Sequence, residues 1–270
     1  MPELPEVETI RCQLAAALPG RRIAAVERVE PFMLRDVSAE ELAAAVPGRR
    51  VEAVRRRGKF LLLPLDDDQV LTLHLGMTGQ LLLQAEPPAG NHVRFAFLFD
   101  SGIRLVFRDM RKFGRLHLTR GGPAARLEGM GPDAWQGAWS AADLAAMLSG
   151  RTAPMKAFLL DQRHLAGIGN IYADEILFAA GLSPLRPAGS LSPAEVERLA
   201  AAIRGKLEEG VRLRGCSISD YVDAAGQAGG FQRALQVYGR HGRICLRCGA
   251  TLARAVVAGR GTAYCPACQS

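Results

Sequence analysis

The sequence predicts an α+β fold, with an N-terminal antiparallel β-sandwich and flanking helices followed by a helical C-terminal part. Three observations support this prediction. Short strand-like runs follow one another closely in the first half without helices between them, which favours an antiparallel sandwich or barrel over a parallel sheet. Helical patterns with start and stop signals fill the second half. A segment rich in Gly, Pro and Ala at 121–137 separates the two as a linker.

The size and charge of the chain limit the class of protein. A chain of 270 residues is long enough for one large or two ordinary domains, each with its own core. No apolar run approaches the length of a membrane span, and no basic-then-apolar signal segment precedes Pro2, so we expect a cytoplasmic protein with no membrane partner. The 34 Lys and Arg residues against 27 Asp and Glu residues give a net charge of +7, which is compatible with a polyanionic partner such as nucleic acid.

The first half begins with a helix and continues in strands. Pro5 suits a first helical turn, and four apolar residues then recur at helical spacing, namely Val7, Ile10, Leu14 and Leu18. A strand at 23–30 and a short helix with a capping box of Ser38 and Glu41 come next. Further strands are predicted at 51–57, 59–64, 70–75, 80–84, 93–99, 103–108 and 115–119. Ser101-Gly102 indicates a hairpin between two of them.

The second half has helical signals and one long loop. Helices are predicted at 140–150, at 154–162 and at 170–180, where Gly181 ends the last. Ser192-Pro193-Ala194-Glu195 combines an N-cap, a first-turn proline and a capping-box glutamate, and this helix extends towards Gly210. Residues 215–230 are predicted to form a long, mobile loop, and strand character returns after Gln236.

Four of the six cysteines form two closely spaced pairs near the end of the chain. Cys245 and Cys248 are one CxxC pair, and Cys265 and Cys268 are the other. Two such turns complete a tetrahedral set of thiolate ligands for one zinc ion, with no open position for a substrate. We therefore predict a zinc ribbon with one structural zinc ion. A pair of disulfides is the alternative, but it is disfavoured in a chain without a secretion signal.

The turn between two predicted helices at 165–172 has the composition of an anion-binding site. Gly167 and Gly169 allow the backbone to approach a ligand closely, and the first N–H groups of the following helix suit a phosphate. Asn170 either adds a side-chain contact to that phosphate or only caps the helix. A helix–turn–helix beside a zinc ribbon in a basic chain favours binding to a DNA backbone.

Three further segments combine basic and apolar residues. A basic run, Arg55-Arg56-Arg57-Gly58-Lys59, enters an apolar strand. Met77 follows His74 in a glycine-flanked turn, and its alternative role is packing in the core. Residues 109–115 place Phe113 among cations in another turn. An apolar tip beside an arginine can fill the gap that is left when a base is extruded from a duplex.

The N-terminus itself is a candidate catalytic group. Met1 before a small residue such as Pro2 is normally removed, which exposes a secondary amine. The pKa of an α-amine is about 7.7–8.0, so a substantial fraction is neutral at physiological pH, whereas that of lysine is about 10.4. A neutral secondary amine that attacks an aldehyde-level carbon forms an iminium ion, which acts as an electron sink. Glu3 and Glu6 are close enough to transfer protons near it. A simple helix start is the alternative.

These motifs occur in one order along the chain and together resemble the bacterial formamidopyrimidine-DNA glycosylase family. The motifs are residues 1–9, Gly58-Lys59-Phe60, residues 74–79, Arg111 with Phe113-Gly114, residues 167–175 and the four-cysteine tail. The resemblance covers essentially the whole chain. It implies a catalytic β-sandwich domain at 1–130, a helix-two-turn-helix DNA-binding domain at 131–235 and a zinc ribbon at 236–270.

The resemblance implies a bifunctional enzyme of base excision repair, a DNA glycosylase with lyase activity at abasic sites. It would flip out and remove oxidised purines (8-oxoguanine and formamidopyrimidines) and then cleave the strand by β,δ-elimination. Pro2 would attack C1′ and form a Schiff base, and Glu3 would be the general acid that opens the deoxyribose ring. Lys59 would bind phosphate and assist β-elimination, and Arg260 would assist δ-elimination.

The resemblance also implies the contacts with damaged double-stranded DNA. Met77, Arg111 and Phe113 would fill the hole in the duplex, with Arg111 facing the orphaned cytosine. The residues expected to hold the DNA are His74, His92, Arg111, Arg151, Lys156, Gly169 and Asn170, and those expected near the everted lesion are Ser217, Ile218, Ser219 and Tyr238. We expect a monomer that associates with the nucleoid through its DNA binding.

The chain departs from the family pattern at a few positions. Met110 stands where proline is common, so the turn that presents Arg111 is expected to be less rigid, and Lys112 replaces a frequent arginine. Cys216-Ser217 replaces small and threonine residues in the loop that selects the lesion. Two other functions were considered, an endonuclease VIII-type glycosylase for oxidised pyrimidines and a non-catalytic DNA-binding protein. Retention of Pro2, Glu3 and Lys59 argues against the second of these.

Overall fold

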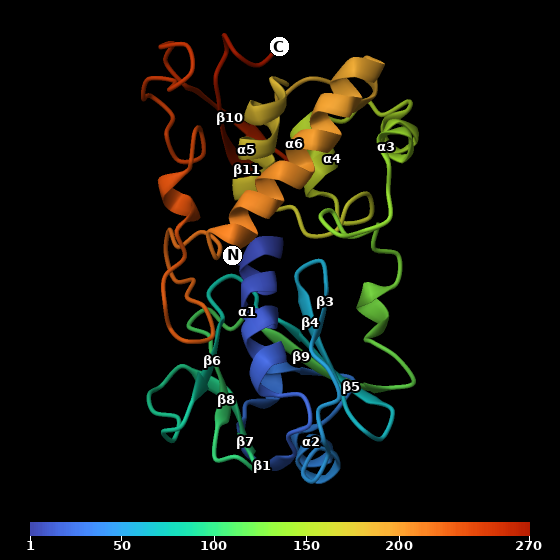
Figure 1. The fold of residues 1–270 in the computed structure, drawn as a ribbon, viewed down its shortest axis with the longest axis vertical. Coiled ribbons are helices and arrows are strands. Elements are labelled where there is room, and N and C mark those ends of the chain that lie inside the picture. Colours follow the sequence, from blue (N-terminus) through green and yellow to red (C-terminus); the bar gives the residue numbers. More distant parts are fainter. The chain divides into compact units, whose positions relative to one another are not determined.

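The computed structural model describes residues 1–270, and the chain divides into two compact units (Figure 1). Unit 1 comprises Met1–Glu128 and Leu213–Gln232, and unit 2 comprises Gly129–Arg212 and Arg233–Ser270. The first crossing between units, after Glu128, lies inside the predicted linker. No helix combines the length and apolar character that a membrane span requires.

Unit 1 contains a β-sandwich, as predicted. One sheet has the strand order β1-β7-β8-β6, and the other has the order β2-β9-β5-β4-β3. The strands are β1 (Ile23–Val29), β2 (Leu34–Arg35), β3 (Arg55–Arg57), β4 (Phe60–Pro64), β5 (Gln69–His74), β6 (Gln80–Gln84), β7 (Val93–Phe99), β8 (Arg104–Arg108) and β9 (Arg115–Arg120). All neighbouring strands are antiparallel except β2 and β9, which run parallel.

The core of unit 1 lies between the two sheets and the first helix. Helix α1 (Leu4–Ala17) directs Val7, Ile10 and Leu14 into the same cluster as the inward-facing residues of both sheets. The expected helical spacing therefore identifies the buried face. Helix α2 (Ala39–Ala45) begins at the predicted capping box, in which the N–H of Glu41 donates to the Ser38 hydroxyl and the Glu41 carboxylate accepts from the Ser38 N–H.

One predicted strand is shorter than expected. The run at 51–57 forms a strand only at Arg55–Arg57, while Val51 makes an isolated bridge to Leu65. The pairing of Arg55 with Leu62 places Pro64 opposite Ala53 when the register is continued. Because proline has no N–H to donate, the ladder is interrupted there.

Unit 2 consists of helices and a two-stranded hairpin. Its helices are α3 (Ala141–Leu148), α4 (Met155–Leu160), α5 (Asn170–Ala180) and α6 (Pro193–Arg212), and its strands are β10 (Ala253–Val257) and β11 (Arg260–Tyr264). All four helices match predicted ones. Helices α5 and α6 pack so closely that a Cβ at Gly210 would lie 2.5 Å from the Tyr172 hydroxyl oxygen, which explains a glycine inside α6.

The predicted loop at 215–230 has no helix or strand, but much of it is anchored to unit 1. Ala224 accepts a hydrogen bond from the N–H of Leu83 on β6, and its own N–H donates to the Gln13 side chain on α1. The buried Asp223 carboxylate accepts the N–H groups of Ala225 and Gln227. These bonds anchor the second half of the loop to unit 1, and its mobility stays a prediction.

A buried ion pair joins α1 to the edge strand β3. The Glu8 carboxylate contacts Arg56 Nε at 2.8 Å, and both side chains are almost fully buried. Arg11 contacts the same carboxylate at 2.8 Å. Burial raises the pKa of Glu8, but the hydrogen bonds from Arg11 and Arg56 outweigh it, and the pKa lies below its usual value. Glu8 is therefore ionised at neutral pH.

We predict that Arg56→Met lowers the free energy of unfolding by about 3–5 kcal/mol, because it leaves the Glu8 charge without its most deeply buried partner. Urea unfolding followed by circular dichroism measures the change. Arg55→Met, on the exposed neighbour, is the control and should change stability by less than about 0.5 kcal/mol. Equal effects of the two substitutions would contradict the assigned role of the pair.

Candidate functional site

The N-terminal residues are held in place by the carboxylate of Glu6. Pro2, Glu3 and Glu6 are all buried, and Glu3 is the N-cap of α1. Glu6 Oε2 accepts the N–H of Glu3 at 2.7 Å, and Glu6 Oε1 accepts the N–H of Cys216 at 2.7 Å. One side chain therefore binds both the start of the chain and the predicted lesion loop within unit 1.

Gly215 is needed for this contact. Its φ of +80° lies in the left-handed region, and a Cβ there would lie 2.8 Å from Glu6 Oε1. Any side chain would strain the backbone and displace the carboxylate. The hydroxyl of Tyr221 closes the same region, since it donates to the carbonyl of Arg214 at 3.2 Å.

Lys59 lies in the turn between β3 and β4 and is largely buried. The ring of His74, at the end of β5, lies 4.7 Å from that of Phe60 between centroids, with the two planes tilted by 47°. Burial, followed by the positive charges of Lys59, Arg126 and Arg115, lowers the pKa of His74 to about 4. The N–H of Gly76 donates to His74 Nδ1 at 3.2 Å, so the neutral ring carries its proton on Nε2. His74 is therefore a neutral hydrogen-bond donor at pH 7.

The turns that carry Met77 and Arg111 lie against each other. A Cβ at Gly76 would lie 2.6 Å from the carbonyl carbon of Phe113, so the two backbones are in direct contact. The Phe113 side chain is 45% exposed, although it is aromatic, and the guanidinium of Arg111 lies 5.1 Å from its ring centroid. The structure thus brings together the three residues expected to fill the hole in a duplex.

His92 is exposed before β7, and its carbonyl accepts the N–H of Asp109 at 2.9 Å. This bond places His92 beside the turn that presents Arg111.

The tip of the predicted lesion loop is exposed at Ile218 and Ser219. Ser217 is held, because its N–H donates to the Gln232 side chain and its hydroxyl donates to the carbonyl of Tyr221.

In unit 2, the predicted anion-binding turn is ordered by Gln162. The Gln162 side chain accepts the N–H of Gly167 at 2.8 Å and donates to the carbonyl of Ile168 at 2.9 Å. Gly169 is the N-cap of α5, and the Asn170 side chain donates to the carbonyl of Gly261 at 3.3 Å. Asn170 therefore links the start of the helix to the β10–β11 hairpin, a contact that neither sequence-based alternative included.

Lys156 differs from the expectation of direct contact with DNA. Its side chain is fully buried, and its ammonium lies 2.7 Å from Asp174 Oδ1 on α5. The same ammonium donates to the carbonyl of Gly261 at 3.0 Å and to the hydroxyl of Thr262 at 2.8 Å. Asp174 also accepts the N–H of Ala263 at 3.1 Å. A buried charge needs such partners, and here they fix the hairpin against α4 and α5.

Arg260 lies at the exposed end of that hairpin, directly after the Ala258-Gly259 turn, in which both residues have positive φ. Arg151 is also exposed and follows α3, where its Nε donates to the carbonyl of Met147.

Tyr238 is held through its backbone. The buried Glu175 carboxylate accepts the N–H groups of Gln236, Val237 and Tyr238 at 2.9–3.0 Å.

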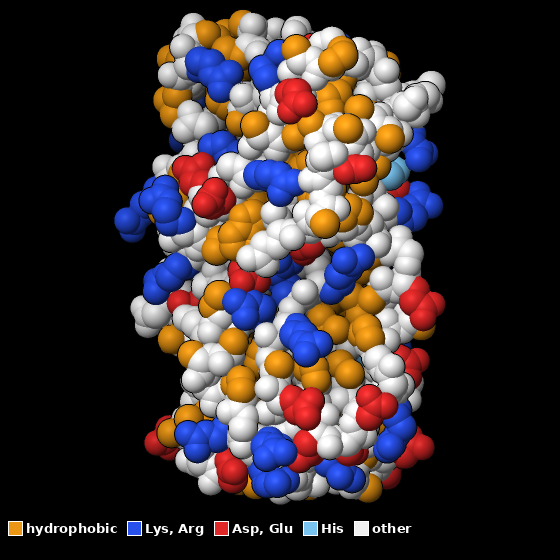
Figure 2. Space-filling model, turned by 45° about the vertical axis from the view of Figure 1, so that its right-hand side comes forward, with side chains coloured by type: hydrophobic (Ala, Val, Ile, Leu, Met, Phe, Trp, Pro, Cys, Tyr) orange, Lys and Arg blue, Asp and Glu red, His pale blue; other side chains and the backbone are white.

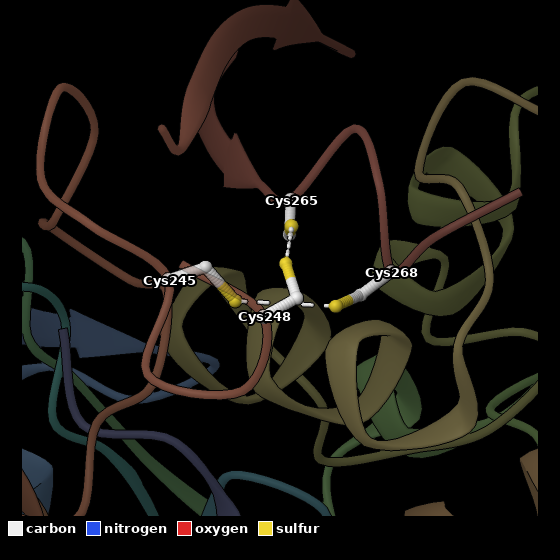
Figure 3. Close-up of side chains that lie close together, drawn as sticks. All are labelled: Cys245, Cys248, Cys265 and Cys268. Carbon is white, nitrogen blue, oxygen red and sulfur yellow. Dashed lines mark hydrogen bonds between the residues drawn. The ribbon is translucent and has the colours of Figure 1, made fainter. Parts of the chain in front are cut away.

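The four cysteines of the predicted zinc ribbon converge in unit 2 (Figure 3). The sulfur atoms of Cys245, Cys248, Cys265 and Cys268 all lie within 4.8 Å of one another. Four thiol groups at this spacing fit a tetrahedral zinc ion, and they leave no ligand position for a substrate. A metal here would therefore be structural.

Sequence reasoning missed several residues that hold the candidate site. Asp109, Gln162 and Glu175 accept backbone N–H groups that order the site, yet no role was assigned to them from the sequence. A charged residue within the apolar helix 170–180 was a usable signal, because a buried carboxylate has to be paired or hydrogen-bonded. Asp109 precedes a turn, where aspartate commonly accepts local N–H groups.

Comparison with known proteins shows three family matches along the chain. The family model for the formamidopyrimidine-DNA glycosylase N-terminal domain matches residues 1–116, and the model for the H2TH domain of the same glycosylase matches residues 130–222. The model for a zinc finger found in FPG and IleRS matches residues 244–270.

Curated relatives and solved structures agree with these matches. The chain is 46% identical to formamidopyrimidine-DNA glycosylase from Carboxydothermus hydrogenoformans over 271 residues, which covers both chains fully. Its structure is similar to that of MutM (Fpg) from Thermus thermophilus, with a TM-score of 0.89 and 44% identity over 99% of this chain and 98% of that one. A variant Fpg from Lactococcus lactis, in complex with DNA containing Fapy-dG, gives a TM-score of 0.92 at 34% identity with full coverage of both chains.

We predict that the purified protein contains one zinc ion per chain and that Cys248→Ser abolishes stoichiometric zinc binding, because three thiolates and a hydroxyl form a much weaker site. Metal analysis by mass spectrometry measures the stoichiometry. Cys12→Ser, outside the cluster, is the control. Zinc retained at one per chain in Cys248→Ser would argue against the four-cysteine site.

We predict that His74 makes stability depend on pH below 6.5. The pKa of His74 is about 4 in the folded protein, against about 6.5 in an unfolded chain. Between these values the unfolded chain binds more protons, so the contribution of neutral His74 is complete above pH 6.5 and is lost as pH falls towards 4. Urea unfolding at pH 4.5 and 7.5 should show a smaller pH difference for His74→Asn than for the parent. His241→Asn, at an exposed histidine, should behave like the parent.

Proposed function

The chain belongs to the formamidopyrimidine-DNA glycosylase family, and on this premise we propose that it removes oxidised purines from damaged double-stranded DNA and cleaves the strand at the resulting site. The observation that carries the proposal is the buried Pro2-Glu3 pair, held at the start of α1 by the Glu6 carboxylate. A nucleophile and a proton donor need such fixed positions relative to a substrate.

The proposed reaction starts from the chain after removal of Met1. The neutral secondary amine of Pro2 forms a bond to C1′ of the damaged nucleoside, and the bond from C1′ to the base breaks. The proton that the amine loses goes to the departing base. Glu3 donates a proton to the ring oxygen as the bond between that oxygen and C1′ opens, which leaves an iminium ion. The iminium acidifies the C2′ hydrogen, so loss of that proton expels the 3′ phosphate. Loss of a further proton at C4′ expels the 5′ phosphate.

Residues of unit 1 support base release and β-elimination in this proposal. We propose that Lys59 binds phosphate and assists β-elimination, and that His74 donates its Nε2 proton to a phosphate oxygen. Met77, Arg111 and Phe113 fill the space of the extruded nucleotide, with Arg111 facing the orphaned base. Ser217, Ile218 and Ser219 contact the everted base, and His92 contacts the backbone.

Residues of unit 2 hold the DNA and complete strand cleavage. We propose that Arg151, Gly169 and Asn170 contact backbone phosphates, that Tyr238 lies near the lesion and that Arg260 assists δ-elimination. The burial of Lys156 supports a different role from the one expected. It positions the hairpin that carries Arg260 and does not contact DNA itself. Basic side chains are interspersed with acidic ones on the face shown in Figure 2.

We propose three functional parts along the chain: a catalytic part at 1–130, a DNA-binding part at 131–235 and a zinc ribbon at 236–270. The last part begins where Glu175 binds the backbone at 236–238. We further propose a monomer that works in the bacterial cytoplasm, associated with the nucleoid through DNA binding.

We predict that borohydride traps the processed protein covalently, through Pro2, on duplex DNA that carries 8-oxoguanine opposite cytosine. Glu3→Gln should lower base release by about 10²- to 10⁴-fold, the range expected for loss of general acid catalysis, with little effect on DNA affinity. Glu52→Gln, at an exposed glutamate of unit 1, is the matched control. Gel analysis of the adduct and mass spectrometry of the N-terminus provide the measurements.

The outcomes separate the three functions considered. Full activity of Glu3→Gln, or of protein that retains Met1, would refute the assigned chemistry. Preference for thymine glycol over 8-oxoguanine would favour the endonuclease VIII-type glycosylase. Binding without an adduct or a strand break would favour the non-catalytic DNA-binding protein.

A further inference from the structure

Three loops at one end of the four-stranded sheet meet at a single buried residue, Asp109. It follows β8 directly, and its side chain is almost fully buried. The loops are the turn after β5 that carries Met77, the segment before β7 that carries His92, and the turn before β9 that carries Arg111 and Phe113. Asp109 directly precedes the turn that carries Arg111 and Phe113, and the sequence patterns assign it no role.

The carboxylate of Asp109 joins two of the loops. Its Oδ1 accepts the Thr78 hydroxyl at 2.6 Å and the N–H of Arg111 at 3.2 Å. Its Oδ2 accepts the N–H of Gly114 at 2.7 Å. Thr78 Oγ1 also accepts the N–H of Arg111 at 3.2 Å. Hydrogen bonds to an ionised carboxylate are short and strong, so the turn at 110–114 is closed from inside and joined to the Met77 turn.

The backbone of Asp109 and the side chain of Arg94 join the third loop. The carbonyl of Asp109 accepts Arg94 Nε at 2.8 Å, and its N–H donates to the carbonyl of His92. Arg94 also donates to the carbonyl of Asn91 and to His92 Nδ1, both at 3.4 Å. Because a guanidinium only donates, His92 Nδ1 has to accept, and the ring proton lies on Nε2. His92 is thereby prepared as a donor to an anion.

The turns that carry Met77 and Arg111 are packed too closely to move independently of each other. Besides the contact between Gly76 and Phe113, a Cβ at Gly114 would lie 2.5 Å from the Phe107 ring. Met110, where the family commonly has proline, is 56% exposed and adds no constraint of its own. The hydrogen bonds of Asp109 therefore restrict the turn that presents Arg111, although Met110 does not.

We propose that Asp109 and Arg94 form one positioning unit, which holds Met77, Arg111, Phe113 and His92 as a single rigid group that enters the duplex together. The proposal rests on the proposed function and names the residues that set its specificity. A pre-formed group loses little conformational entropy when it replaces the extruded nucleotide. Arg111 can then discriminate the opposite base only while the unit is intact.

Asp109→Asn tests the proposal. Asparagine has one acceptor oxygen, so the N–H of Gly114 or the N–H of Arg111 then faces an NH2 group in place of a carboxylate oxygen. We expect excision of 8-oxoguanine opposite cytosine to fall about 10- to 100-fold, as for loss of a buried hydrogen bond to a charged group. Discrimination between cytosine and adenine opposite the lesion should fall as well. Borohydride trapping at a preformed abasic site, where no base has to be unstacked, should change by less than about 3-fold.

Two further variants keep the test informative. Asp100→Asn is the matched control, because Asp100 also accepts a backbone N–H in a turn of the same sheet but at its opposite end. Thr78→Val removes only the link between the two turns and should show the same pattern with a smaller loss, even if Asp109→Asn unfolds. The fluorescence of 2-aminopurine next to the lesion reports base extrusion, and it should fall in both Asp109→Asn and Thr78→Val.

Two results would overturn the proposal. One is equal loss of excision and of abasic-site trapping with unchanged opposite-base discrimination, which indicates a purely structural role. The other is unchanged excision in a folded Asp109→Asn protein. Failure of the parent protein to form an adduct at an abasic site would instead refute the proposed function, so the two failures are distinguishable.

Discussion

The organisation of unit 1 depends on the two hydrogen bonds of the Glu6 carboxylate. They join Glu3 to Cys216, residues that are more than 200 positions apart in the chain. Each bond is 2.7 Å long and lies in a buried region, where a charged acceptor without partners would be costly. The carboxylate therefore requires both the N-terminal residues and the loop after α6 to be in place. Gly215 is the residue that makes this approach possible.

Unit 2 uses the same kind of interaction for a different purpose. Glu175 binds three successive N–H groups before the zinc ribbon, and the pair of Lys156 and Asp174 binds the hairpin that carries Arg260. In both cases a buried charged side chain on a helix fixes the position of a neighbouring segment. Exposed residues of the candidate site are thus held in position by buried side chains behind them.

Much of the fold could be predicted from local patterns. Closely spaced strand-like runs identified the long strands, the capping box located α2 to the residue, and the two CxxC pairs identified the cysteine cluster. These features depend on residues a few positions apart. The parallel pairing of β2 with β9 and the burial of Lys156 depend on residues that are distant in the chain, so no local pattern reveals them. Lys156 was expected to hold the DNA only because the resemblance to the family implied it.

The return of Leu213–Gln232 to unit 1 has a consequence for biosynthesis. A ribosome that has made residues 1–128 has produced every strand of the sandwich but not the segment that binds Gln13, Leu83 and Glu6. The nascent sandwich waits for the whole helical insertion to emerge before its last segment arrives. Chains cut short within that insertion lack the segment that binds the Glu6 carboxylate, so a prematurely terminated product does not assemble the complete N-terminal site.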